Sequence, residues 1–205
     1  MKRRNFIKNT ALAGTAWVLP WKLQGAGLSN AKPLHFGLIA GVHQDIMHDA
    51  PKRLQVFIDA ANGQKTEFIM QLGDFCVPHE RNRPFMEVWE QFKGPKYHVL
   101  GNHDTDGRFN QQQAMDFWGM PSRYYSFDRA GYHFVVLDGN DANPAPWSGY
   151  HRYIHHNPQP WLQQDLENTN LPTFIFSHQT LENEDGGVAN QQEVRQLLEA
   201  ASFFQ

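Results

Sequence analysis

From residue 34 onward, short apolar runs alternate along the chain with longer segments in which apolar residues recur every three or four positions. The apolar runs are typical of buried strands, and they cover residues 34–43, 67–75 and 96–104. The periodic segments are typical of helices, and they cover residues 50–63, 83–92 and 111–119. This alternation predicts an α/β layered domain whose strands in this half are largely parallel.

The pattern changes after Pro121. Residues 123–140 predict two strands joined by a tight turn, that is, a β-hairpin. A helix, a strand and a last helix follow, at residues 158–168, 171–179 and 190–204. Residues 141–158 predict a long loop rich in proline, glycine, aromatic residues and histidine. Loops of this length in a compact domain are usually functional or mobile.

The composition fits one globular domain and narrows the functional classes. Hydrophobic residues make up 40% of the 205 residues and charged residues 19%, which is enough apolar material for a core. A formal net charge of -3 does not indicate a nucleic-acid-binding surface. The single cysteine, Cys76, excludes an internal disulfide and a cysteine-based zinc cluster, and we expect it to be buried. Nothing in the sequence indicates an oligomeric state.

Residues 1–30 have the features of an export signal. Lys2, Arg3 and Arg4 precede an apolar run at residues 11–19 that is too short to span a bilayer, and small residues follow it. An amphipathic first helix is the alternative. Residues 3–8 resemble the twin-arginine motif Arg-Arg-x-Phe-x-Lys, which implies export of the folded protein to the periplasm by the twin-arginine machinery. We expect the folded domain to occupy residues 31–205.

Polar side chains follow four of the predicted strands at the point where each strand ends. These strand-end residues are His43, Asp74, the pair Asn102 and His103, and His178. In an open α/β sheet, ligands bind beyond the carboxyl ends of the strands, so the four ends are expected to converge on one site. Oxygen and imidazole donors without a thiolate suit manganese, iron or zinc better than calcium.

Three motifs resemble those of the calcineurin-like metallophosphoesterases: Gly-Asp-Phe at 73–75, Gly-Asn-His-Asp at 101–104 and the strand-end His178. The resemblance extends over residues 34–205. It implies a sandwich of two mixed β-sheets with helices on both outer faces. It also implies hydrolysis of a small phosphorylated substrate, a phosphate mono- or diester, with two divalent metal ions.

The resemblance assigns a role to each residue of the motifs. Asp74 would bridge the two metal ions; His43 would bind the first ion, and Asn102 and His178 would bind the second. His103 would face the leaving group and donate a proton to it. Asp104 would fix the tautomer of His103, or alternatively cap a turn.

The sequence departs from the family pattern in two places. Gly41 stands where the family has an aspartate of its Asp-x-His motif, so the first metal loses a carboxylate ligand, and Asp45 is the carboxylate that follows His43 most closely. A Gly-His-x-His motif expected after His178 does not occur before Gln205. Two hypotheses therefore stand: the N-terminal part of a longer enzyme, or a truncated, non-catalytic copy that acts as a binding module.

The remaining histidines and the aromatic residues of the long loop carry weaker expectations. His98 lies within a strand and is expected to be structural. A surface or substrate-rim role is expected for His151, His155 and His156. Three aromatic residues of the loop could stack on a nucleoside or sugar, and packing of the loop explains them equally well: Trp147, Tyr150 and Tyr153.

Overall fold

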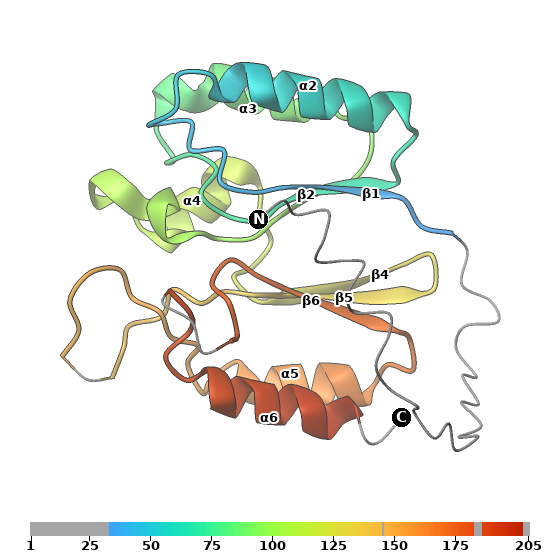
Figure 1. Cartoon of the computed structure of the whole chain (residues 1–205), viewed down its shortest axis with the longest axis vertical. Helices are drawn as coiled ribbons and strands as arrows, with labels where there is room; N and C mark the ends of the chain where they lie inside the picture. The colour runs from blue at the N-terminus through green and yellow to red at the C-terminus, as the bar shows by residue number, and fades with distance from the viewer. Residues whose placement is uncertain (1–32, 145, 183–185, 203–205) are drawn as a thin grey trace, which may run out of the picture.

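The computed structural model describes residues 33–144, 146–182 and 186–202, and these residues form a layered α/β sandwich (Figure 1). Two three-stranded sheets face each other, and helices cover both outer faces. The predicted α/β sandwich is thereby confirmed. The predicted export signal lies outside the described residues. Across the described ranges, no helix has both the length and the apolarity needed to cross a membrane.

The first sheet is built from the alternating half of the sequence. Its strands are parallel, in the order β1 (Phe36–Ile39), β2 (Phe68–Gln71) and β3 (Lys96–His98). Its helices are α2 (Ala50–Gly63), α3 (Arg83–Glu90) and α4 (Gln111–Trp118). Two short 3-10 segments, η3 (Glu80–Asn82) and η4 (Asn102–Arg108), precede α3 and α4.

The second sheet mixes strand directions. Its strands, in spatial order, are β4 (Tyr125–Arg129), β5 (Tyr132–Leu137) and β6 (Thr173–Ser177). β4 and β5 form the predicted antiparallel hairpin, whose two-residue turn has positive φ at Ala130 and Gly131, and β5 pairs with β6 in parallel. Helices α5 (Gln159–Glu167) and α6 (Gln191–Ser202) cover its outer face (Figure 1). Among the described strands, only this sheet is mixed.

Aromatic side chains fill the space between the two sheets and fix how the strands face each other. The rings of Tyr97 on β3 and Phe127 on β4 stack at 3.7 Å between centroids. Phe68 on β2 meets Phe134 on β5 edge-to-face at 5.2 Å. Phe36 on β1 lies against β6. The free edges of β1 and β6 are therefore on the same side of the sandwich.

That open side is partly apolar at its surface. Leu38 on β1 is 42% exposed and Phe174 on β6 is 40% exposed. In the described part of the chain, β1 pairs only with β2, and β6 pairs only with β5. Both sheets thus end in an edge strand at the same place.

His133 joins α5 to the second sheet. Its Nδ1 lies 2.6 Å from Asp128 Oδ1 on the neighbouring strand, and its Nε2 lies 2.9 Å from Asp165 Oδ2 on α5. Burial lowers the pKa of His133, but the hydrogen bonds to the two carboxylates outweigh burial and hold that pKa above its usual 6.5. The protonated ring therefore stabilises the fold.

We expect the cost of His133→Gln to depend on pH. Because the folded pKa of His133 lies above the unfolded one, its stabilisation is complete below about pH 6.5 and is lost as pH rises through the folded pKa. Urea unfolding should show a larger loss of stability at about pH 5.5 than at about pH 9. His98→Gln should show the opposite trend, because burial lowers the pKa of His98 to about 3. The same pH trend for both variants would contradict the raised pKa of His133 or the lowered pKa of His98.

Candidate metal centre

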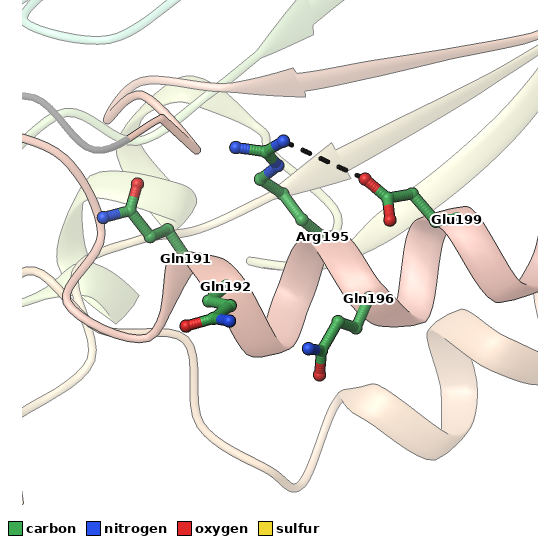
Figure 2. Close-up of a pocket in the computed structure, with 5 residues that line it drawn as sticks. All are labelled: Gln191, Gln192, Arg195, Gln196 and Glu199. Carbon is green, nitrogen blue, oxygen red and sulfur yellow. Dashed lines mark ion pairs between the residues drawn. The ribbon is translucent and has the colours of Figure 1, made fainter.

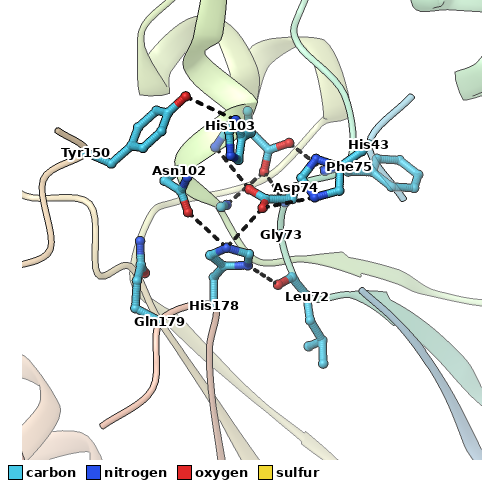
Figure 3. A network of polar contacts seen from close by, with 12 residues as sticks. His43, Leu72, Gly73, Asp74, Phe75, Asn102, His103, Tyr150, His178 and Gln179 are labelled. Atoms are coloured by element: carbon cyan, nitrogen blue, oxygen red, sulfur yellow. Dashed lines mark hydrogen bonds and ion pairs between the residues drawn. The ribbon is translucent and has the colours of Figure 1, made fainter. Parts of the chain in front are cut away.

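The segments that follow β1, β2, β3 and β6 meet at one end of the sandwich (Figure 3). The segment after β1 continues alongside the segment after β2: the amide of Gly41 donates to the Gly73 carbonyl at 3.1 Å, and the amide of His43 donates to the Asp74 carbonyl at 2.8 Å. His43 and Asp74 both have positive φ, 51° and 55°, which is uncommon for residues other than glycine. Such strain is typical of functional sites.

Two glycines allow the strand ends to approach each other. A Cβ on Gly73 would overlap the imidazole of His178, which comes from the other sheet. A Cβ on Gly101 would overlap the backbone nitrogen and the carboxylate of Asp74. The ends of β2, β3 and β6 therefore come this close only because both positions lack a side chain.

Asp74 is the centre of the polar cluster in Figure 3. Its Oδ2 lies 3.4 Å from Nε2 of His43 and 3.4 Å from Nε2 of His178. Nε2 of His178 also lies 3.2 Å from Oδ1 of Asn102. Burial raises the pKa of Asp74, but the hydrogen bonds of His178 and of the His103 amide, helped by the nearby histidine charges, outweigh burial and hold that pKa below its usual value. Asp74 is therefore an ionised carboxylate.

The ring of His178 is oriented by the backbone. Its Nδ1–H donates to the Leu72 carbonyl at 2.8 Å, which leaves Nε2 to face Asp74 and Asn102. A hydrogen bond from the second ring nitrogen to a carbonyl oxygen is a usual way in which proteins orient a metal-binding histidine. Burial lowers the pKa of His178, and Asp74 more than compensates, so that this pKa is raised.

The spacing of these donors fits a metal ion. Two ligands about 2.0–2.1 Å from a tetrahedral ion lie about 3.4 Å apart. This is the distance from Asp74 Oδ2 to Nε2 of His43 and to Nε2 of His178. Within the described ranges, however, no three His, Cys, Asp or Glu side chains are grouped so that they could hold an ion by themselves. The amide oxygen of Asn102 is the third donor on one side, while the other side has only His43 and Asp74.

The structure gives Asp104 the turn-capping role and places another carboxylate beside His103. Asp104 is fully buried and accepts hydrogen bonds from the amides of Asp74, Phe75 and Gly101, at 2.9, 2.6 and 2.8 Å. The expectation that Asp104 fixes the His103 tautomer is wrong in this geometry, because both carboxylate oxygens are used by backbone donors. Nδ1 of His103 lies 2.8 Å from Asp106 Oδ2 instead.

Among the three aromatic residues that the sequence places in the long loop, Tyr150 is the one that reaches His103. Its hydroxyl donates to Asp106 Oδ1 at 2.8 Å and lies 3.1 Å from His103 Nδ1. The other loop aromatics contact the loop itself or its flanks: Trp147 Nε1–H donates to the Tyr150 carbonyl, and the Tyr153 hydroxyl meets His156. Tyr150 lies 44 positions after Asp106, which explains why sequence spacing gives no signal.

Asp45 does not replace the carboxylate that Gly41 lacks. Its Oδ2 accepts from the Val77 amide at 2.8 Å, and its Oδ1 accepts from the side chains of Arg81 and Asn82 at 2.8 and 2.9 Å. The carboxylate therefore holds the segment after β2 rather than facing His43.

The other histidines with weaker expectations make their contacts outside the Asp74 cluster. His98 is buried, hydrogen-bonded to Gln71 and stacked on Trp118, as expected for a structural residue. His151 and His156 contact Asn143 and Glu193. Cys76 is buried as expected.

Three hollows differ in their chemistry. The hollow at the strand ends is small, 30 Å³, and its lining includes His43, Asp74, His103 and Asp106. Another lies along α6, has a volume of 430 Å³ and is lined by three glutamines and the pair Arg195 and Glu199 (Figure 2). It contains no histidine or aspartate. A third hollow, of 610 Å³, has Asp141 and His155 in its lining, but the Asp141 carboxylate accepts from Arg123 and Tyr124. The candidate site is therefore the strand-end hollow, where Asp74 lies between two histidines.

We expect Gly41→Asp to strengthen metal binding beside His43. A Cβ on Gly41 would lie 3.8 Å from the His43 ring, an ordinary contact, so the structure leaves room for a carboxylate there. The backbone has φ +57°, which aspartate tolerates better than most residues. Calorimetric titration with Mn²⁺ should show the stoichiometry rising towards two ions per chain.

Gly41→Asn is the matched control for this variant, because it has the same shape and backbone tolerance without the negative charge. It should give the smaller gain. If the Gly41 protein already binds two ions tightly, another group supplies the missing ligand and the prediction is wrong.

A carboxylate between two imidazoles, at the strand ends of an α/β sandwich, is suited to binding metal ions in a hydrolase. The sequence profile of the calcineurin-like phosphoesterases matches residues 35–202. The chain belongs to this family, and the resemblance seen in its three motifs is confirmed.

Individual proteins agree with this assignment. A manganese-dependent ADP-ribose/CDP-alcohol diphosphatase from Arabidopsis thaliana is 29% identical over 97 residues, which cover 42% of this chain and 31% of that protein. The match thus spans less than a third of that curated relative. A dimetal phosphatase from Danio rerio has a similar fold, with a TM-score of 0.61 at 18% identity, covering 82% of this chain and 77% of that one. A purple acid phosphatase from yellow lupin (Lupinus luteus) has a TM-score of 0.51 at 12% identity, covering 78% and 34%.

Proposed function

We propose that the protein hydrolyses phosphate esters of small molecules with a pair of divalent metal ions, manganese, iron or zinc. His43 and Asp74 would hold the first ion, and Asp74, Asn102 and His178 the second. The observation that carries this proposal is the position of Asp74 Oδ2, 3.4 Å from a histidine nitrogen on either side. Family membership agrees with it, because the family consists of phosphoesterases.

Bound metal ions would supply Lewis-acid polarisation of the phosphoryl group and neutralise its charge. The residues of the chain supply the rest. Asp74 contributes an ionised carboxylate, and Asp104 fixes the turn that carries Asn102 and His103. His103 holds the proton that the leaving-group oxygen takes up as its bond to phosphorus breaks.

Hydrolysis of p-nitrophenyl phosphate and bis(p-nitrophenyl) phosphate tests the proposal. Turnover should disappear after exhaustive chelation and return when Mn²⁺ is added. ADP-ribose belongs in the same assay, because the Arabidopsis relative is named for that substrate. Undiminished turnover in the chelated, metal-free protein would exclude the mechanism.

A non-catalytic binding module is the second candidate. Gly41 and the two-ligand set at His43 and Asp74 favour it, because an incomplete first site holds its ion weakly. The discriminating result is tight binding of phosphate esters in the presence of Mn²⁺ without hydrolysis of any of them.

We also propose that the protein is exported to the periplasm by the twin-arginine machinery, on the basis of Arg3 and Arg4. Changing both residues to lysine should leave the protein in the cytoplasm, because the charge is kept while the recognised pair is lost. Fractionation of cells that express the two forms measures this. Periplasmic protein in the double variant would contradict the proposal.

A further inference from the structure

We infer that Asp106 is the positioning residue of His103, and that Tyr150 attaches the 141–158 loop to this pair and thereby forms one wall of the leaving-group subsite. The inference rests on the proposed function, since it assigns parts to the same reaction. The three side chains come from two segments that are far apart in the sequence and meet at the edge of the strand-end hollow.

The contact between Asp106 and His103 fixes which ring nitrogen can transfer a proton. Nδ1–H of His103 donates to Asp106 Oδ2 at 2.8 Å, so Nε2 is the nitrogen that remains for the leaving group. In the reaction, the bond from phosphorus to the leaving oxygen breaks while the Nε2 proton passes to that oxygen. Water forms the new bond to phosphorus and releases a proton to solvent, and Nε2 regains a proton from solvent before the next turnover. A carboxylate on Nδ1 keeps the ring oriented for this transfer.

The backbone is built to bring Asp106 back towards His103. The 3-10 segment Asn102–Arg108 is interrupted at Asp106, with ψ 157°, and at Gly107, with φ 75°. The chain therefore turns sharply immediately after Asp106. In a 3-10 turn, residues three apart lie above each other, and His103 and Asp106 have this spacing.

The contacts of Asp106 differ from those of a structural aspartate. Asp104, two residues earlier, accepts from three backbone amides and is fully buried. The Asp106 carboxylate instead contacts two side chains, His103 and Tyr150, and is 40% exposed. The Asp106 carboxylate therefore orients the side chains of His103 and Tyr150 rather than stabilising a backbone turn.

Tyr150 connects the loop to the pair. Its hydroxyl donates to Asp106 and lies 3.1 Å from Nδ1 of His103, and the two rings are 4.7 Å apart. Tyr150 is nevertheless 45% exposed, so part of its ring remains open to a ligand. Trp147 supports it: the indole N–H donates to the Tyr150 carbonyl at 2.7 Å, and Arg152 lies over the indole ring. An exposed aromatic ring thus stands beside the residue that would protonate the leaving group.

Asp106→Asn tests the positioning role by its dependence on the leaving group. A good leaving group such as p-nitrophenolate needs little protonation, whereas the more basic phenolate needs it strongly. We expect kcat for phenyl phosphate to fall about 10- to 100-fold, and kcat for p-nitrophenyl phosphate to fall much less. An equal loss on both substrates would indicate a structural role and would overturn the inference.

A second measurement does not depend on activity. ¹⁵N NMR of the imidazole of His103, in the metal-free protein, reports which nitrogen carries the proton. With the ring neutral, the wild type should show the Nδ1–H form, and Asp106→Ala, which removes the acceptor of that N–H, should lose this preference. An unchanged tautomer overturns the inference even if the protein is inactive, while absent turnover with an Asp106-dependent tautomer contradicts only the proposed function.

Two matched controls exist in the chain. Asp128 accepts from Nδ1 of His133 at 2.6 Å, outside the site, so Asp128→Asn removes the same type of contact and should leave both kcat values unchanged.

Tyr150→Phe should raise the KM for phenyl phosphate about 2- to 10-fold, the effect of one lost hydrogen bond. Tyr153→Phe removes a hydroxyl from the same loop and should not raise it. Equal KM values for Tyr150→Phe and the wild type would exclude a role of Tyr150 in forming the leaving-group subsite.

Discussion

Replacing His103 with alanine should lower the turnover of phosphate esters about 10²- to 10⁴-fold while leaving the metal content of the protein nearly unchanged. The loss follows from the removal of the group that donates the proton to the leaving oxygen. The effect should be greatest for substrates whose leaving group is basic. Steady-state kinetics together with metal analysis of the same preparations measure both parts of the prediction.

The metal content should persist because the hydrogen bond that His103 gives to Asp74 comes from its backbone. The amide of His103 donates to Asp74 Oδ1 at 3.0 Å, and alanine keeps that amide. The side chain points elsewhere, with Nδ1 on Asp106. His178→Ala is the contrasting variant, since it removes a side chain that faces Asp74 directly. If His103→Ala loses its metal as His178→Ala does, His103 is a ligand and its assigned role is wrong.

Gly101→Ala should destabilise the protein by about 3 kcal/mol or more and abolish metal binding. Gly101 has φ -97° and ψ 169°, a conformation open to any residue, so backbone strain is not the reason. The reason is steric: the new methyl group would overlap the backbone nitrogen of Asp74, which cannot move without displacing the whole strand end. Thermal or urea unfolding measures the stability, and calorimetric titration with Mn²⁺ measures the binding.

Gly63→Ala is the matched control for Gly101→Ala. Gly63 is the last residue of α2, and a Cβ there would meet nothing within 4 Å. The substitution should be neutral or stabilise the protein by about 0.4–1 kcal/mol, because alanine restricts the unfolded chain. Equal stability of the Gly101→Ala and wild-type proteins would show that β2 and β3 can separate at no cost.

The sequence was sufficient to predict the elements of the fold because local patterns determine them. The 50–63 helix has the predicted bounds, and the 111–119 helix ends one residue early, at Trp118. Gly119 then adopts the left-handed conformation that often ends a helix. The convergence of His43, Asp74 and Asn102 was also predictable, since parallel strands bring their carboxyl ends to one edge of a sheet. His178 follows β6 in the other sheet, so its place beside them depends on how the two sheets face each other.

The partners of His103 were less accessible to sequence reasoning. Asp104 was favoured because it adjoins His103, but neighbouring side chains in a tight turn point in different directions. Asp106 had a signal, the three-residue spacing of a 3-10 turn, but its orientation depends on the kink at Gly107. Tyr150 had none, because its place is set by how a long loop folds against a turn 44 residues away.

The open side of the sandwich has a consequence for the protein in concentrated solution. An edge strand offers unpaired backbone donors and acceptors to any other extended segment, and natural proteins usually protect such edges with charges or bulges. Here β1 and β6 place two edges together, and the side chains exposed beside them include Leu38 and Phe174. For the residues that the structure describes, we therefore expect aggregation to begin by strand addition along this side, on the two strands that lead into His43 and His178.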